Sequence, residues 1–97
     1  MLITILTGQV SAENDEILKE RFARELRHTP PGLLQTFLIQ AHEEPQRWQI
    51  ISIWRSREAF EQAHSEKLTD ACVQMFCDAG STPERTSYRV VENYTRV

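Results

Sequence analysis

One histidine of this sequence has the type and spacing to support chemistry beside a group of aromatic residues. His64 lies four residues after Phe60 and four before Leu68, so on a continuous helix it would share their apolar stripe. A histidine ionises near neutral pH and can act as a general base on a phenolic hydroxyl. His64 is therefore the candidate catalytic base. A partly exposed histidine at a helix break, bonded to backbone or water, is the alternative interpretation.

Aromatic side chains could form a pocket around such a base. Trp48 and Trp54 stand an even number of positions apart on a predicted strand, so they point to the same face. Oxidation of an aromatic substrate by O₂ needs an apolar, aromatic-walled site with few polar groups. In a small domain the same residues could simply form the core. The candidate substrate-binding residues are Trp54, Phe60, Phe22, Phe76 and Tyr88.

Several polar residues have two interpretations each. Tyr88, on the last predicted strand, could donate a hydrogen bond to a substrate oxygen or lie at a subunit interface. Arg55, Arg89 and Asn93 could orient an anion, or could pair with backbone groups and carboxylates. His28 falls at the end of a predicted helix, where a surface position is expected.

Periodicity and turn signals predict the elements that would position these residues. The predicted strands are residues 1–7, 33–41, 47–55 and 86–94; the predicted helices run from Ser11 or Asn14 to His28 and from Ser56 to Ala79, with a break across residues 64–67. The first strand is expected to stop at Gly8. The order β-α-β-β-α-β predicts an α+β, ferredoxin-like fold, with one four-stranded antiparallel sheet and the helices on one face.

Both faces of the predicted sheet are apolar. In the first strand, Leu2 and Leu6 point to one face while Ile3 and Ile5 point to the other. Helices on one side leave the second face open, and monomeric proteins rarely expose large apolar patches. We therefore expect a homodimer formed through the sheet face. A monomer with an apolar exposed sheet is the alternative.

Length and composition limit the number of domains, the kinds of partner and the cellular location that we expect. The 97 residues predict a single domain over 1–97, and a net charge of −3 with interleaved acids and bases argues against nucleic-acid binding. The N-terminal apolar run is too short for a signal peptide or a membrane span, so we expect a cytoplasmic protein without a membrane partner. Cys72 and Cys77 are expected to remain reduced. No local motif of a metal, nucleotide or hydrolase site occurs, so neither a metal nor a cofactor is expected.

The passage ISIWRSREAF at residues 51–60 resembles the antibiotic biosynthesis monooxygenase domain, whose members carry W-x-S-x-E-A-F/H at this strand-to-helix junction. GLL at 32–34 and the short Glu-Pro hairpin are similar too, and the element order matches across nearly the whole chain. The resemblance implies a dimeric α/β barrel with a pocket between sheet and helices in each subunit. Some members oxidise aromatic phenols or quinols with O₂ and no metal or flavin. Others degrade haem, and many have no established activity.

The haem-degrading branch shows a pattern with asparagine on the first strand and with tryptophan and histidine in the second helical region. Residues 1–8 contain no asparagine, and Ala63 and Cys72 stand about where the tryptophan and histidine would be. The resemblance therefore favours a cofactor-independent monooxygenase that takes O₂ and a small phenol- or quinol-type substrate. A non-catalytic small-molecule-binding or structural homodimer of the same fold is the alternative.

Overall fold

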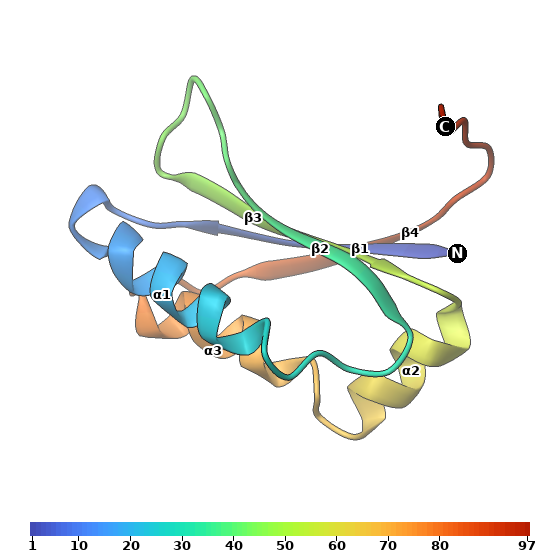
Figure 1. The fold of residues 1–97 in the computed structure, drawn as a ribbon. Coiled ribbons are helices and arrows are strands. Elements are labelled where there is room, and N and C mark those ends of the chain that lie inside the picture. The colour runs from blue at the N-terminus through green and yellow to red at the C-terminus, as the bar shows by residue number, and fades with distance from the viewer.

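Helices cover one face of a four-stranded antiparallel sheet in the computed structural model, which describes residues 1–97 (Figure 1). The elements are β1 (Leu2–Gln9), the 3-10 helix η1 (Ala12–Asn14), α1 (Asp15–Glu25), β2 (Leu33–Gln40), β3 (Arg47–Trp54), α2 (Arg57–Ser65), α3 (Asp70–Asp78) and β4 (Glu84–Arg89). The predicted α+β, ferredoxin-like fold is confirmed. None of the helices combines the length and the apolar character that a membrane crossing requires.

The strand order β2-β3-β1-β4 places β1 and β3 at the centre of the sheet. Leu6 of β1 pairs with Ile50 on one side and with Arg85 on the other, so all three side chains point toward the helices. Burial follows the same alternation, since Leu2 and Leu6 are buried while Ile3 and Ile5 are partly exposed. The register therefore decides which residues of each strand meet the helix layer.

Two strand ends differ from the prediction. Gly8 lies inside β1, where a Cβ atom would stand 2.6 Å from Cδ1 of Phe76, so the glycine makes room for the ring of α3. β4 ends at Arg89 rather than at residue 94. Val90 N–H donates the last bond, to the carbonyl of Met1 at 3.2 Å. Because β1 begins at Leu2, the residues after Val90 have no neighbouring strand residue to pair with.

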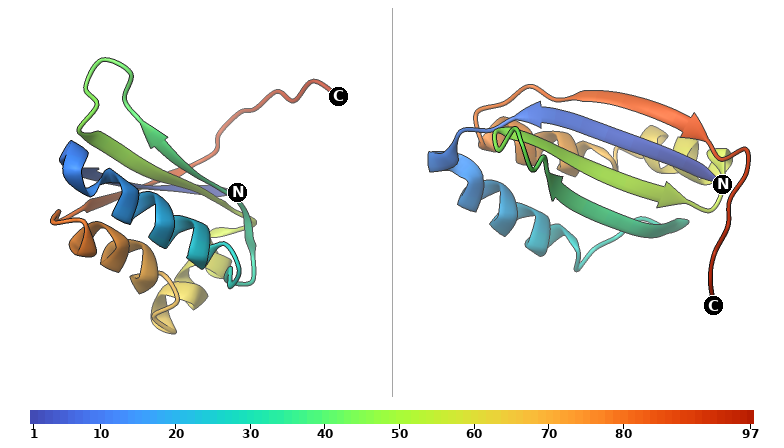
Figure 2. Two further views of the ribbon diagram at one scale, coloured as in Figure 1. Left: turned by 60° about the vertical axis from the view of Figure 1, so that its left-hand side comes forward. Right: turned by 90° about the horizontal axis from the view of Figure 1, so that it is seen from above.

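The predicted break in the second helical region is confirmed. The hydroxyl of Ser56 caps α2 by accepting from the Ala59 N–H at 3.1 Å. The helix ends at Ser65, and the chain turns through Lys67, whose φ is +61°. α3 then starts at Asp70 and packs beside α1 (Figure 2).

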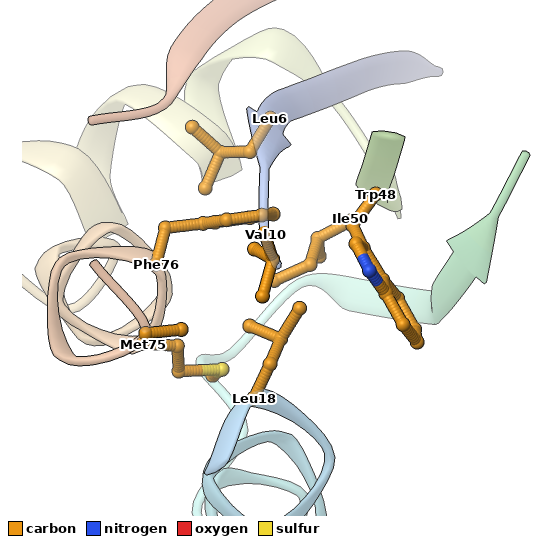
Figure 3. Packing of buried hydrophobic residues seen from close by; sticks show 8 residues of the cluster. Leu6, Val10, Leu18, Trp48, Ile50, Met75 and Phe76 are labelled. Carbon is orange, nitrogen blue, oxygen red and sulfur yellow. The ribbon is translucent and has the colours of Figure 1, made fainter. Parts of the chain in front are cut away.

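Two hydrophobic clusters lie between the sheet and the helices. The larger one joins Leu18 of α1 and Phe76 of α3 to the inner face of β1 and β3; its members are Leu6, Val10, Leu18, Trp48, Ile50, Met75, Phe76 and Ala79 (Figure 3). The smaller one consists of Leu2, Trp54 and Ala63, with Leu33 and Phe60 packed against it. The two tryptophans share a strand face, as predicted, yet they belong to different clusters.

The other face of the sheet is bare and apolar, as the sequence predicts. The register turns Phe37 and Ile39 of β2 outward, together with Ile51 and Ile53 of β3. No helix lies on this side of the sheet in any view (Figures 1 and 2). The exposed large apolar side chains on it are Phe37, Ile39 and Tyr88, with Leu34 exposed at the β2 bulge.

Candidate functional site

A narrow cavity opens between the inner face of the sheet and the helix layer. Its enclosed part has a volume of about 50 Å³, and the space including the open mouth is about 610 Å³. The walls are mostly apolar and come from all four strands and from α1, α2 and α3. An apolar cleft with a few polar groups is the usual form of a small-molecule site.

The sheet leaves room for this cavity because one row of its inner residues is small. Thr4, Ser52 and Thr36 face one another across β1, β3 and β2. The hydroxyls of Thr36 and Ser52 lie 3.0 Å apart and share a hydrogen bond. Next to this row stand much larger side chains, Trp54 on one side and Ile50 on the other. The small hydroxyl residues thus form a polar floor between bulky neighbours.

An aromatic wall closes one end of the cavity. Trp54 meets Phe60 edge to face, with ring centroids 5.3 Å apart and an interplanar angle of 68°. The indole Nε1 of Trp54 donates to the hydroxyl of Thr4 at 3.0 Å, which fixes the ring against the floor. Phe22 of α1 lines the same cavity. The structure thus brings together Trp54, Phe60 and Phe22 of the predicted substrate-binding residues.

The side chain of Arg85 supplies a half-buried positive charge to this apolar cavity. Its Nη2 donates to the backbone carbonyl of Thr69 at 3.3 Å, and its guanidinium carbon lies 5.8 Å from the ring centroid of Phe60. No carboxylate forms an ion pair with it. Burial lowers the pKa of Arg85, while Cys72 and Asp70 act in the opposite direction. Arg85 is therefore a cation that forms no ion pair, although the acidic residue Glu25 also lines the cavity.

Arg85 is not among the candidate residues that the sequence indicates. The sequence does indicate that Arg85, Ser87 and Arg89 share one face of β4, because they stand two residues apart on a strand. Which face that is depends on the pairing of β4 with β1. Leu6, the partner of Arg85, points to the helices, and so Arg85 does too.

Cys72 of α3 also lines the cavity. Burial raises the pKa of its thiol; Arg85 opposes that shift and Glu25 reinforces it. A thiol with a raised pKa stays protonated at neutral pH and is a weak nucleophile. The cavity is thus better suited to binding than to thiolate chemistry.

Three of the residues that the sequence singled out lie outside this cavity. Phe76 is completely buried in the larger cluster against Gly8. Tyr88 is on the outer face of the sheet, because its partner Ile3 points away from the helices. The side chain of His64 is largely exposed, and its ring stacks on Phe60 with centroids 5.6 Å apart. His28 is exposed, as expected, and it also lines the cavity.

A family comparison fits this architecture. The family model of the antibiotic biosynthesis monooxygenases matches residues 1–75. The chain belongs to this family. The resemblance seen at residues 51–60 is thereby confirmed, and this part of the family domain contains the aromatic wall. Arg85 lies beyond the matched residues.

Solved structures share the fold of this antibiotic biosynthesis monooxygenase family member. A Deinococcus radiodurans protein described provisionally as an antibiotic biosynthesis monooxygenase has a TM-score of 0.78 at 19% identity, covering 100% of this chain and 99% of its own. The haem degrader MhuD from Mycobacterium tuberculosis, with two haems bound, has a TM-score of 0.75 at 21% identity, covering 98% and 100%. SnoaB from Streptomyces nogalater, a cofactor-independent oxygenase, has a TM-score of 0.67 at 16% identity, covering 98% and 97%. At these identities the likeness shows the fold alone. Among curated proteins, no sequence matches this chain significantly.

Proposed function

We propose that this protein is a cofactor-independent monooxygenase that oxidises a small phenol- or quinol-type substrate held as its anion against Arg85. One observation carries the proposal: a half-buried guanidinium that forms no ion pair faces an aromatic-walled cavity. A half-buried charge that is paired only with a carbonyl and an aromatic ring is incompletely compensated, so a bound anion would stabilise it. The relatives that act as oxygenases support the reaction class.

Arg85 would also favour the reactive form of the substrate. A phenol has a pKa of about 10 in water, and a cation within a few ångströms lowers it by favouring the charged form. The phenolate is the electron-rich species that can pass electrons to O₂. The apolar walls around Trp54 and Phe60 admit O₂ and keep water out. Binding and activation would thus come from the same guanidinium.

The substrate itself can supply the electrons for this reaction. When a phenol becomes a para-quinone, one O₂ is consumed, one oxygen atom enters the product and the other leaves as water. No external reductant is needed for that balance. The enclosed part of the cavity, about 50 Å³, is smaller than the roughly 150 Å³ that holds a benzene ring, so a phenol would extend into the open mouth. A porphyrin would require a much wider opening.

Oxygen uptake tests the reaction. With a panel of phenols and hydroquinones we expect O₂ consumption above that of heat-denatured protein, and label from ¹⁸O₂ in one product oxygen. The methyl ethers of the same compounds cannot ionise and should give no uptake. Quenching of tryptophan fluorescence by the phenols without any O₂ consumption would instead support the non-catalytic binding protein.

We further propose that the bare sheet face joins two copies of this chain. Its exposed apolar residues form one continuous surface around Phe37 and Ile39. The β2–β3 hairpin and the segment after β4 both project on this side of the sheet, away from the helices (Figure 1). That segment carries exposed Val91 and Tyr94. A second copy packed face to face would cover the sheet and meet both projections.

Phe37→Glu is expected to convert the dimer into a monomer at micromolar concentration, because it places a charge in the middle of an apolar interface. Size-exclusion chromatography with light scattering measures the change. Ile17→Glu, an exposed apolar position on α1, is the matched control and should leave the mass unchanged. A wild-type protein that is monomeric under these conditions would rule out the sheet-to-sheet dimer.

A further inference from the structure

We infer that His64 is a positioning residue, which fixes the guanidinium of Arg85 through Thr69 and Phe60 instead of removing a proton from the substrate. The inference rests on the proposed function, in which Arg85 binds the substrate anion. Four contacts support it: His64 contacts Thr69 and Phe60, and Arg85 contacts the same two residues. Thr69 belongs to the joint between α2 and α3, residues 66–69.

The joint has a defined conformation. The Leu68 N–H donates to the Ala63 carbonyl at 2.9 Å, and the Lys67 N–H donates to the His64 carbonyl at 3.0 Å. Together with the positive φ of Lys67, these bonds form a Schellman motif that ends α2. The motif folds the chain back so that Thr69 comes beside His64.

Thr69 uses its hydroxyl in an unusual way. It is the N-cap residue of α3, a position at which threonine commonly accepts a bond from the helix's own N–H groups, but here its side chain makes no capping bond. Its Oγ1 lies 2.9 Å from Nδ1 of His64, and the residue is only 5% exposed. The hydroxyl of Thr69 thus links α2 to α3 instead of capping α3.

The same residue holds Arg85. The Thr69 carbonyl accepts the bond from Nη2 of Arg85, and Phe60 provides the ring beside the guanidinium. His64 contacts both of these groups, since it hydrogen-bonds to Thr69 and stacks on Phe60 at an interplanar angle of 20°. The imidazole of His64 therefore contacts both of the groups that hold the guanidinium of Arg85 in place.

The position of His64 does not suit a base. A general base must come within about 2.6–3.2 Å of the proton that it removes, directly or through one water. The side chain of His64 is on the solvent side of Phe60 and Thr69 and does not line the cavity. His64 instead contacts Thr69 and Phe60, the two residues that hold Arg85.

Binding of benzoate, an aromatic anion, tests the inference, with neutral benzamide as the comparison ligand. His64→Ala and Thr69→Val are each expected to raise the Kd of benzoate about three- to tenfold, the usual weight of one hydrogen bond, and to leave benzamide within about twofold. His64→Asn and Thr69→Ser keep a hydrogen-bonding group and should restore most of the affinity. The two losses should not add in the double variant. His42→Ala, in the exposed β2–β3 hairpin, is the control.

A second measurement needs no ligand. The Nε–H signal of Arg85 in the ¹H–¹⁵N spectrum, assigned by its absence in Arg85→Met, should move toward the exposed arginines in His64→Ala and Thr69→Val but not in His64→Asn. An unchanged signal in both of the first two variants would overturn the positioning role. If wild-type protein fails to bind benzoate while the signal moves as expected, the proposed anion site is wrong and the positioning of Arg85 by His64 still stands.

Discussion

Arg85→Met is expected to lower kcat/KM for a phenol substrate by roughly 10- to 100-fold, because hydrogen bonds to a charged partner contribute about 1.5–3 kcal/mol. The methionine side chain keeps an apolar stem of similar reach beside Phe60 but provides no positive charge. The phenol would then bind mostly in its neutral form. Steady-state O₂ uptake at several pH values measures the loss, and the variant should recover part of its activity as pH rises toward the pKa of the free phenol.

The fold should tolerate this replacement. Burial lowers the pKa of Arg85, so the folded state disfavours the charged form, and this penalty is present at every pH below the folded pKa, including neutral pH. Removing a half-buried charge that forms no ion pair is therefore expected to leave the free energy of unfolding within about 1 kcal/mol of wild type.

Two further variants sharpen the Arg85 prediction. Arg85→Lys keeps the charge but loses the planar fork, and should restore only part of the activity. Arg89→Met changes an exposed arginine on the same face of β4 and should have no effect on kcat/KM. Equal losses in Arg85→Met and Arg89→Met would mean that general surface charge, and not the cavity cation, attracts the substrate.

Phe76→Ala is expected to lower the free energy of unfolding by about 3–5 kcal/mol, the range for removing a large buried aromatic side chain. Phe76 is 0% exposed and ties α3 to the sheet at Gly8. A small domain has a total stability of only about 5–15 kcal/mol, so the variant should be close to unfolding at 37 °C. Urea denaturation followed by circular dichroism measures the change.

Gly8→Ala tests the same contact from the other side. The added methyl group would stand 2.6 Å from the Phe76 ring and 2.8 Å from Oγ of Ser81, so we expect a loss of about 1–3 kcal/mol from overpacking. In the Phe76→Ala background the clash with the ring is gone, and Gly8→Ala should cost clearly less. Additive losses in the double variant would contradict the proposed contact.

Local patterns were sufficient for the order of the elements. The run of isoleucine and tryptophan over residues 47–54, the cap at Ser56 and the polar stretch after Ala63 predicted β3, the start of α2 and the break before α3, and all three are present. These features depend on neighbours within a few residues, because backbone propensity and capping are local effects. The family resemblance came from the same strand-to-helix junction.

The predictions that failed involve distant partners. Gly8 reads locally as a stop, but it continues β1 because Phe76, far along the chain, needs the space of a missing side chain. The last strand looked longer than it is, because its end depends on where β1 can still pair with it. Tyr88 had two interpretations, in the cavity or at a subunit interface, and the same pairing excludes the cavity by turning it to the outer face.

The sequence by itself determined the elements, their order, the family, the two-sided apolar sheet and the aromatic residues Trp54 and Phe60 at one junction. Only the tertiary structure decided where a ligand could bind. The row of Thr4, Ser52 and Thr36 forms the cavity floor because strands distant in sequence pair in one register. That register also turns Arg85 inward. Register follows from the packing of the whole sheet against the helices, so no local pattern could have fixed it.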